Sequence, residues 1–397
     1  MKKKLLFVME SMGSGGGERS LLTLLQLMDY DKYNVDLLLF NPSGLFMDMI
    51  PPQVNIISFG KGYDRFVQPI GTSIKAYFMK GNIKGAYNRI MYSKTVNGKG
   101  GSSLYRDQLA WKYMRCVFEN NLPEYDAAIG YLEGKPNFFV ADCVKAKFKI
   151  GYIHSDYRKL EMDKKFDEKI FEKLDYVVGV SEKCADILRE EFPALKDKIR
   201  TIENITSPIV LRKMAEENVA EYENDNSKIL LTIGRISPPK GYDIAVDAAE
   251  ILAQNGVDFK WFAIGKGELR AEIEQKIKEK KLEGKFILLG ERANPYPYIA
   301  GCDIYVQPSY FEGKSIAIDE AKCFAKPIVA TKFTTVLDQL ADGETALLAE
   351  IDAASVAEKI MQLISDKDLC ESLSENLKKE KLGNEEEIEK FYEMLGE

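Results

Sequence analysis

Pro308-Ser-Tyr-Phe-Glu-Gly-Lys-Ser-Ile-Ala-Ile-Asp-Glu320 is the stretch that indicates how this chain of 397 residues folds. The run before it, 303–307, predicts a short buried strand that ends at the proline. Gly313 permits a sharp turn, Ser315 is a typical helix N-cap, and a helix is expected over Ile316–Ala325. Strand, tight loop and helix start direct backbone N–H groups and the positive end of a helix to one point, which suits a phosphate or a sugar hydroxyl.

Two glutamates frame this loop. Glu312 precedes the turn and Glu320 follows eight residues later. Eight residues advance a helix by about two turns, so both carboxylates are expected to face the same cleft. Glutamates at arbitrary spacing are more often solvated residues of a surface helix. The neighbouring proline, glycine and serines favour a ligand site instead.

These residues carry a resemblance to a known family. Glu312 and Glu320 reproduce the E-x7-E motif of the retaining GT-B glycosyltransferases of family 4, and Pro308-Ser309 and Lys326-Pro-Ile-Val-Ala330 are also similar to that family. The resemblance covers nearly the whole chain and is strongest over 228–349. It implies a GT-B fold of two doubly wound Rossmann-like domains that face each other across a cleft. It also implies sugar transfer with retention at the anomeric carbon, by front-side attack without an obligatory protein nucleophile.

Strands alternate with helices along two parts of the chain, which predicts an α/β fold with parallel sheets and two doubly wound domains. In the first part, strands are expected at Lys3–Met9, Val35–Phe40, Val54–Phe59, Ala127–Tyr131, Lys149–Ile153, Tyr176–Val180 and Ile199–Glu203. In the second part, strands are expected at Ile229–Ile233, Phe259–Ile264, Phe286–Leu289, Ile304–Gln307 and Pro327–Ala330, with helices at Tyr242–Gln254, at Glu268–Lys280 and from Ala354.

We expect four parts along the chain. Residues 1–210 form an N-terminal, acceptor-binding domain, and the polar, acidic segment 211–227 is a linker. Residues 228–380 form a nucleotide-sugar-binding domain, and 381–397 form a C-terminal helix. The family resemblance implies that this last helix returns to the N-terminal domain.

Composition is that of a globular protein, with 45% hydrophobic and 29% charged residues. No segment approaches the roughly 20 apolar residues of a membrane span. The basic N-terminus leads into only five apolar residues, too few for a signal peptide. The six cysteines have no C-x-x-C spacing, which favours reduced thiols in the cytoplasm. Because His154 is the only histidine, a His-rich zinc site is excluded. We expect no metal and no other cofactor.

The segment 61–117 has its own character. It contains eleven Lys or Arg and two Asp, so its charge is 11 − 2 = +9 within a chain of net charge −7. Aromatic residues are interleaved with the cations. Such a surface suits the headgroup region of an anionic membrane, and equally RNA or a solvated insertion. The acidic chain as a whole argues against nucleic acid, which leaves peripheral contact with the inner face of the cell membrane and a solvated insertion as the open alternatives.

Two cations follow the first strand of the second domain. Gly234-Arg235 and Lys240-Gly241 stand where the ligand crevice of a doubly wound fold lies. Arginine binds a diphosphate by paired hydrogen bonds and lysine as a point charge. The pattern is weak in isolation, but its match to the family implies a phosphate role. Arg235 and Lys240, with the helix end, would then stabilise the departing diphosphate.

The resemblance also assigns donor contacts to the second domain. It places Glu312 near the reacting carbon and Glu320 on the ribose hydroxyls. The amides of Gly313, Lys314, Ser315 and Ile316 would hold the sugar and phosphates. Lys314 stands where an aromatic or small residue is common, so it adds charge near the diphosphate or changes the choice of sugar.

A glycine pair closes the strand Phe259–Ile264. Gly265-Lys266-Gly267 resembles the family's Gly-Asp-Gly turn, with a lysine where an acid is usual. We expect the two glycines to permit close approach of the backbone to the nucleotide. The lysine removes any role that the acid would have.

In the first domain, a glycine-rich segment follows the first strand. The dinucleotide fingerprint fails because Glu18 occupies the third glycine position, so an NAD enzyme is not predicted. Gly16 and Gly17 are instead expected in a flexible loop that lets the donor approach the backbone.

Three further side chains stand near strand ends. A lone histidine after a strand is usually structural. The family resemblance nevertheless favours contact of His154 with the donor sugar. Glu133 and Asp156 are weak candidates for acceptor binding.

Together these features predict a glycosyltransferase that moves a sugar from a nucleoside diphosphate sugar to an acceptor hydroxyl. The family bias indicates UDP, and a lipid-linked intermediate of a surface polysaccharide would fit the basic, aromatic segment. Two alternatives stay open. A nucleotide-sugar epimerase on the same fold would need no acceptor, and a non-catalytic partner subunit would need a second transferase.

Overall fold

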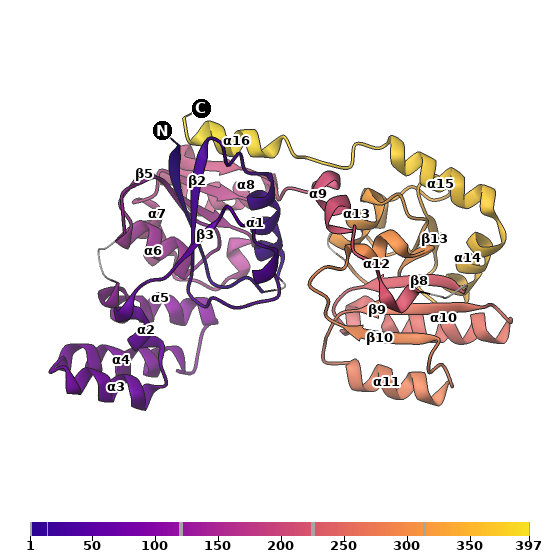
Figure 1. The fold of residues 1–397 in the computed structure, drawn as a ribbon, viewed down its shortest axis with the longest axis horizontal. Coiled ribbons are helices and arrows are strands. Elements are labelled where there is room, and N and C mark those ends of the chain that lie inside the picture. Colours follow the sequence, from indigo (N-terminus) through magenta and orange to yellow (C-terminus); the bar gives the residue numbers. More distant parts are fainter. Residues whose placement is uncertain (1, 14, 119–121, 224–226, 313–314, 397) are drawn as a thin grey trace. The chain divides into compact units, whose positions relative to one another are not determined.

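The computed structural model describes residues 2–13, 15–118, 122–223, 227–312 and 315–396 (Figure 1). The chain divides into two compact units. One comprises residues 1–205 and 385–397, and the other comprises residues 206–384. Each unit is built around one parallel sheet with helices packed on it.

The first unit contains a seven-stranded sheet in the order β3-β2-β1-β4-β5-β6-β7, and every pairing is parallel. Residues 5–9 of the central strand β1 are fully buried, which explains why this strand is a continuous apolar run. The strand order reverses between β1 and β4, so the carboxyl ends of these two strands flank the usual ligand position. The strands are β1 Lys3–Met9, β2 Tyr33–Leu39, β3 Asn55–Ile57, β4 Tyr125–Gly130, β5 Ala146–Ile153, β6 Tyr176–Gly179 and β7 Ile199–Thr201.

The helices of the first unit include a group that the sequence analysis did not delimit, α2 to α5. The last helix of the chain, α16, also packs here: the Tyr392 ring stacks on Tyr33 at 5.1 Å between centroids, and Phe391 lies 5.9 Å from Phe7. The α-helices are α1 Gly16–Leu27, α2 Lys61–Val67, α3 Ile70–Met79, α4 Ile83–Val96, α5 Ser103–Met114, α6 Lys135–Cys143, α7 Lys164–Phe171, α8 Glu182–Glu191 and α16 Glu387–Met394, with 3-10 helices η1 Met47–Met49, η2 Arg115–Val117, η3 Tyr157–Lys159 and η4 Pro193–Lys198.

The second unit contains a six-stranded parallel sheet in the order β10-β9-β8-β11-β12-β13, which reverses between β8 and β11. Helices α10, α11 and α14 share the core on one face, and α9, α12 and α13 share the core on the other. The strands are β8 Lys228–Ile233, β9 Phe259–Ile264, β10 Phe286–Gly290, β11 Ile304–Gln307, β12 Ile328–Thr331 and β13 Leu347–Ala349. The helices are α9 Pro208–Met214, α10 Tyr242–Gln254, α11 Arg270–Glu279, α12 Tyr296–Gly301, α13 Ile316–Cys323, α14 Ala353–Ser365 and α15 Lys367–Lys379, with 3-10 helices η5 Ala220–Tyr222, η6 Pro238–Lys240 and η7 Val336–Asp338.

The predicted fold class, α/β with two doubly wound parallel sheets, is confirmed. The segment 211–227, expected as a linker, instead contributes to the second unit. Leu211 is buried in its core, and the Tyr222 ring packs on Phe262 at 5.0 Å between centroids. Glu216 and Glu217 are exposed, whereas Glu221 lies in η5 and pairs with Arg292 at 3.2 Å, so the acidic composition did not mark a boundary. The chain passes from one unit to the other at residues 205/206 and again at 384/385.

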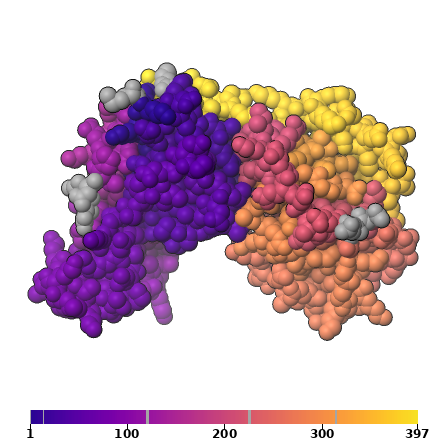
Figure 2. All heavy atoms as spheres, in the orientation of Figure 1, coloured from indigo at the N-terminus to yellow at the C-terminus, as the bar shows by residue number. Residues whose placement is uncertain are grey.

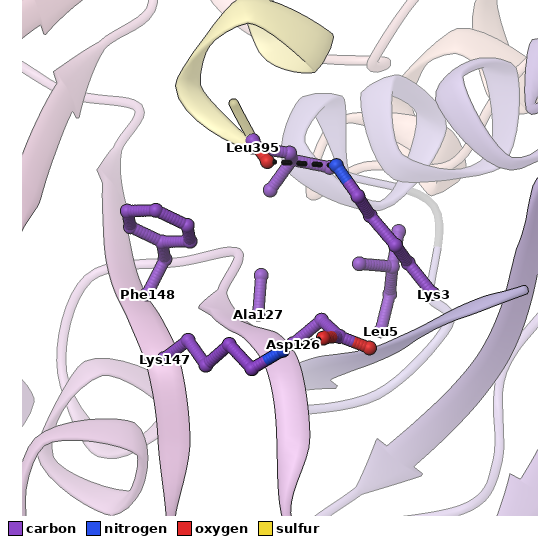
Figure 3. A pocket seen from close by; sticks show the side chains of 7 residues that line it. All are labelled: Lys3, Leu5, Asp126, Ala127, Lys147, Phe148 and Leu395. Atoms are coloured by element: carbon purple, nitrogen blue, oxygen red, sulfur yellow. Dashed lines mark hydrogen bonds and ion pairs between the residues drawn. The ribbon is translucent and has the colours of Figure 1, made fainter. Parts of the chain in front are cut away.

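A small cavity of about 130 Å³ lies at the amino ends of β1, β4 and β5 (Figure 3). Lys3 Nζ closes it by donating to the Leu395 carbonyl at 2.9 Å. Asp126 accepts from Lys147 Nζ at 2.6 Å, and this hydrogen bond lowers the pKa of Asp126. Ligands of such sheets bind at the opposite, carboxyl edge, so this cavity is a packing feature.

Among the helices in the described ranges, none is long and apolar enough to cross a bilayer.

Among the described residues of the first unit, the most deeply buried carboxyl group is that of Asp167. Asp167 on α7 is 1% exposed and accepts a hydrogen bond from the Tyr157 hydroxyl at 2.8 Å. Burial raises the pKa of Asp167 from 3.8 to about 7. The folded state therefore holds this proton more tightly than the unfolded state. The resulting stabilisation is complete below about pH 4 and is lost as the pH rises through 7.

We expect Asp167→Asn to remove this contribution to the pH dependence. Relative to the variant, the wild type should lose stability between about pH 4 and pH 7, by a few kcal/mol at about 1.4 kcal/mol per pKa unit. Thermal unfolding at a series of pH values measures this difference. Asp186→Asn, at a side chain 61% exposed on α8, is the control and should follow the wild type. Parallel profiles for wild type and Asp167→Asn would contradict the assignment.

Candidate active site

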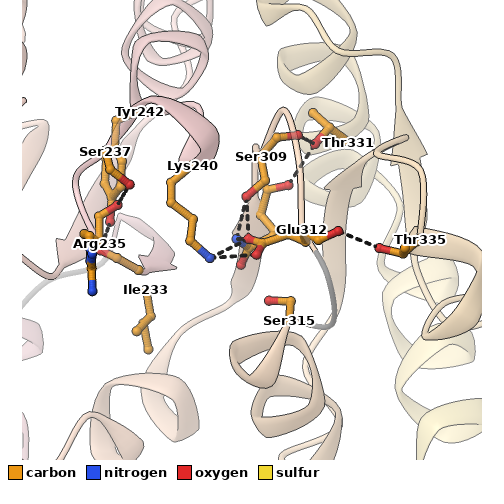
Figure 4. Close-up of polar contacts among 12 residues, drawn as sticks. Ile233, Arg235, Ser237, Lys240, Tyr242, Ser309, Glu312, Ser315, Thr331 and Thr335 are labelled. Carbon is orange, nitrogen blue, oxygen red and sulfur yellow. Dashed lines mark hydrogen bonds and ion pairs between the residues drawn. The ribbon is translucent and has the colours of Figure 1, made fainter. Parts of the chain in front are cut away.

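Two loops of the second unit meet where its strand order reverses (Figure 4). One follows β8 and spans 234–241, and the other begins at Pro308 after β11. Gly241 has φ +62°, and a Cβ at this position would lie 1.9 Å from the Pro308 carbonyl oxygen. The Tyr310 amide also donates to the Pro239 carbonyl at 2.8 Å. Only glycine permits this approach, so Gly241 joins the two loops into one surface.

An ion pair joins the same two loops. Lys240 Nζ donates to both carboxylate oxygens of Glu312, at 2.7 and 2.8 Å. Gln307 Nε2 and Ser309 Oγ donate to Oε1 of the same carboxylate, at 2.9 and 2.8 Å. Glu312 is 7% exposed, so its charge is buried but fully supplied with donors. The structure thus brings together two of the predicted residues, Lys240 and Glu312, and pairs them with each other.

A layer of buried hydroxyl and amide groups supports this carboxylate. The Tyr305 hydroxyl donates to Gln307 Oε1 at 2.7 Å, Thr331 Oγ1 donates to the Ser309 carbonyl at 2.5 Å, and Thr335 Oγ1 donates to the Glu312 carbonyl at 3.0 Å. The sequence analysis missed these residues. A glutamine that ends a buried apolar strand was an available signal, because buried amides need partners. The two threonines follow a different strand and gave no local signal.

Arg235 has a different environment from Lys240, although both belong to the loop after β8. Its side chain is exposed and makes no ion pair in the described part of the chain. In Figure 4, Lys240 extends toward Glu312 whereas Arg235 does not. Of the two predicted cations, Arg235 therefore carries the charge that is available to an external anion.

The glycines after β9 pack against the loop after β8. A Cβ at Gly265 would lie 1.9 Å from the Gly234 carbonyl oxygen, and a Cβ at Gly267 would lie 2.0 Å from the Ile236 carbonyl oxygen. Close contact between the two loops therefore explains why both positions require glycine. Approach of this backbone to a nucleotide remains a prediction. Lys266, which stands between them, pairs with Glu291 at 2.7 Å.

Helix α13 begins at Ile316 with Ser315 in the N-cap position. The expected side-chain cap is wrong: the Ser315 hydroxyl makes no capping bond. Gln339 holds the residue instead, because its Oε1 accepts from the Ser315 amide at 2.8 Å and its Nε2 donates to the Ser315 carbonyl at 2.9 Å. The Ile316 side chain is exposed. Gly313 and Lys314 lie outside the described residues.

Glu320 is 2% exposed on α13, and its Oε1 accepts from the Tyr296 hydroxyl at 3.0 Å. Tyr296 is a further residue that the sequence did not indicate. Burial is the main cause that raises the pKa of Tyr305, and the charges of Tyr242, Glu320 and Glu312 contribute. That both carboxylates face one ligand cleft, as expected from the E-x7-E spacing, stays a prediction.

In the first unit, the turns after β1, β4 and β5 meet at the reversal of its strand order. Gly16 and Gly17 form the first turn of α1, so the predicted flexible loop is wrong at these two positions. A Cβ at Gly17 would lie 3.0 Å from Leu132 Cδ1 and 3.7 Å from His154 Nδ1. The absence of a side chain at Gly17 leaves the imidazole room beside the helix start.

His154 is held through its backbone. Its amide donates to Glu133 at 3.0 Å, and the Ser155 hydroxyl donates to the same carboxylate at 2.8 Å. Both ring nitrogens are buried without a well-oriented hydrogen-bond partner among the described residues. Burial lowers the pKa of His154, opposed by the Glu133 charge and the Tyr131 backbone. A neutral imidazole with unused nitrogens can exchange hydrogen bonds with a ligand hydroxyl.

The two weak candidates both have local structural contacts. Glu133 is buried and positions His154, as described above. Asp156 caps η3 by accepting from the Arg158 amide at 3.1 Å. Their proposed contact with an acceptor stays a prediction. No group of three or more His, Cys, Asp or Glu that could hold a metal occurs within the described ranges.

Comparison with known proteins gives one family match, over residues 214–380, to the family described as glycosyl transferases group 1. The chain is 26% identical over 352 residues to the N-acetylgalactosamine-N,N'-diacetylbacillosaminyl-diphospho-undecaprenol 4-alpha-N-acetylgalactosaminyltransferase of Campylobacter jejuni, covering 88% of this chain and 87% of that protein. It is 24% identical to the poly(ribitol-phosphate) alpha-N-acetylglucosaminyltransferase of Staphylococcus aureus, covering 62% of this chain and half of that protein.

Solved structures show the same fold. TarM of S. aureus, crystallised with UDP and alpha-GlcNAc-glycerol, aligns with a TM-score of 0.61 at 16% identity over the full length of both chains. HepE of Anabaena, crystallised with UDP and glucose, aligns with a TM-score of 0.59 at 16% identity over 99% of both chains.

The contact at Gly241 gives a prediction about stability. Gly241→Ala and Gly256→Ala both place alanine at a positive φ, of +62° and +73°, which costs about 1–2 kcal/mol. Only the first variant also drives a methyl group into the Pro308 carbonyl, which should add about 1–3 kcal/mol. A Cβ at Gly256 meets nothing within 4 Å, so Gly256→Ala is the matched control. Equal thermal shifts for the two variants would show that the loops are not held in contact.

Proposed function

We propose, from the match of residues 214–380 to the family described as glycosyl transferases group 1, that this glycosyltransferase transfers a sugar from a UDP-sugar to the hydroxyl of a surface glycan, with retention of the anomeric configuration. The observation that carries the proposal is the pair of cations on the loop after β8. Arg235 is exposed and unpaired in the described ranges, and Lys240 is fixed by Glu312 at the reversal of the strand order.

The proposed donor is a UDP-sugar held by the second unit. Arg235 would bind the diphosphate through its planar fork of donors, and Lys240 would add a positive charge whose position is fixed by its carboxylate partner. The buried Glu320, oriented by Tyr296, would accept hydrogen bonds from the ribose hydroxyls. UDP is preferred because HepE and TarM, which share the fold, have been crystallised with it.

The proposed acceptor is a lipid-linked or polymeric glycan. The relative that aligns over most of the chain has a diphospho-undecaprenol glycan as its named substrate, and the S. aureus relative acts on poly(ribitol-phosphate). We assign the acceptor to the first unit, where Glu133 is buried and Asp156 lies at the same edge of the sheet.

In the proposed reaction, the bond between the anomeric carbon and the diphosphate oxygen breaks, and the acceptor oxygen bonds to the same carbon from the same face. The acceptor proton passes to the departing diphosphate. Arg235 and Lys240 stabilise the negative charge that develops on that leaving group. Glu312 holds the lysine in place through both of its carboxylate oxygens. His154 is proposed to orient the donor sugar through its unused ring nitrogens.

We further propose that these fixed cations make a divalent metal unnecessary, because they supply the charge that a metal would bring to the diphosphate. Sugar transfer should therefore persist in EDTA. A loss of transfer that Mg²⁺ or Mn²⁺ restores would contradict this part of the proposal.

We expect Arg235→Ala and Lys240→Ala to lower the rate of sugar transfer by about 10²-fold or more, the usual effect of removing one charge-stabilising donor. Glu320→Ala should mainly weaken donor binding, seen as a higher KM for the UDP-sugar. Steady-state kinetics and calorimetric titration with UDP separate the two effects. Lys266→Ala is the control, because this lysine is 71% exposed and pairs with Glu291. Wild-type kinetics for the three test variants would refute the assignment.

A further inference from the structure

A long acid-free segment belongs to the first unit. Residues 65–106 contain no Asp or Glu, although the chain as a whole is acidic. The same segment contains eight basic residues: Arg65, Lys75, Lys80, Lys84, Arg89, Lys94, Lys99 and Arg106. It covers the end of α2, all of α3 and α4, and the start of α5. Without acids to neutralise them, these cations give the helices a one-sided positive field.

Large apolar side chains are exposed on the same helices. We call residues 78–84, where α3 ends and α4 begins, the α3–α4 tip. Met79 and Ile83 in this tip are 79% and 70% exposed, and Phe78 is 58% exposed. Tyr87 and Ile90 continue the exposed row along α4, at four and seven residues from Ile83, which places them on one helix face. Figure 2 shows the atoms of these helices as a projection from the rest of the unit.

Lysines surround this apolar row. Lys75, Lys80 and Lys84 are exposed and make no ion pair in the part of the chain that the structure describes. Lys84 also lines a cavity of about 310 Å³, together with Arg65 and the side chains of Asn82 and Asn88. Two cations and two amides thus line one cavity, and groups of both kinds can bind a phosphate.

The helices that precede and follow α3 and α4 in the chain, α2 and α5, are attached to the rest of the first unit. The Tyr63 hydroxyl of α2 donates to the Phe40 carbonyl, just after β2, at 2.8 Å. Trp111 Nε1 of α5 donates to Asp142 of α6 at 2.8 Å. The α3–α4 pair is thus held between two anchored helices of the unit.

We propose that the α3–α4 tip docks on an anionic phospholipid bilayer. Phe78, Met79 and Ile83 enter the interfacial region, and Lys75, Lys80 and Lys84 contact lipid phosphates. Phe78 is the one residue of the tip with an aromatic ring, whereas Met79 and Ile83, which are more exposed, cannot stack on bases, and this disfavours RNA as the partner. The inference deepens the proposed function and rests on it for its purpose, because a membrane-bound acceptor must be met at the lipid surface.

Sedimentation with vesicles tests the proposal. The full chain, without nucleotide, should bind vesicles of phosphatidylcholine with about 30% phosphatidylglycerol and not pure phosphatidylcholine vesicles. Lys75→Gln, Lys80→Gln and Lys84→Gln combined should weaken binding by about fivefold per lysine. Phe78→Ser, Met79→Ser and Ile83→Ser combined should abolish it at low and high salt alike. All six side chains are exposed, so both variants should unfold at the same temperature as the wild type.

Matched controls use exposed residues elsewhere. Ile209→Ser changes an isoleucine that is 73% exposed on α9. Lys159→Gln, Lys183→Gln and Lys281→Gln combined remove the same charge from other exposed positions. Both control variants should bind vesicles like the wild type. Equal losses in test and control variants would show that net charge alone is responsible, and would overturn the proposal.

Two other outcomes are decisive. Absence of wild-type binding to anionic vesicles overturns the docking surface. Displacement from vesicles by single-stranded RNA, with RNA binding lost in the lysine variant and kept in the Phe78, Met79 and Ile83 variant, makes RNA the partner instead. Hydrolysis of UDP-sugars, measured without vesicles, reports on the proposed function separately: a wild-type protein that hydrolyses UDP-sugars but does not bind anionic vesicles refutes the docking alone.

Discussion

The close approach of two loops at the reversal of the second sheet is the constraint on which the candidate site depends. The strand order reverses between β8 and β11, so the connections that follow these two strands are free to diverge. Here Gly241 removes the side chain that would keep the connections apart, and the Lys240–Glu312 pair joins them. A buried carboxylate would be costly alone, but this one receives donors from a lysine, an amide and a hydroxyl.

The two cations of the loop after β8, Lys240 and Arg235, therefore have different roles. Lys240 is committed to a carboxylate, which fixes its position before any ligand arrives. Arg235 remains exposed, and its guanidinium can pair with an anionic ligand. Fixing charges in advance is what stabilises a developing anion without reorganisation during the reaction. The first unit has a similar arrangement. Glu133 holds the backbone of His154, and neither ring nitrogen has a well-oriented hydrogen-bond partner among the described residues.

Much of this arrangement could be predicted from the sequence, because local rules decide it. The strand bounds of β1, β9 and β11 and both ends of α10 match the patterns of apolar residues. The pairing of Lys240 with Glu312 could not be predicted, because it joins residues 72 positions apart. Likewise, the start of α13 is bound not by the Ser315 hydroxyl but by Gln339, whose side chain hydrogen-bonds the Ser315 backbone from a position 24 residues away. Helices α3 and α4 were missed for another reason: their apolar residues face outward as well as inward, so no single amphipathic stripe marks them.

The measurement that tests the central claim most directly is a crystal structure of the protein with UDP. The account predicts the diphosphate against the Arg235 guanidinium and near Lys240, at the end of β8, with the ribose hydroxyls directed to Glu320. Nucleotide bound away from these residues, for example at the start of α1, would contradict the claim that the joined loops of the second sheet form the donor site.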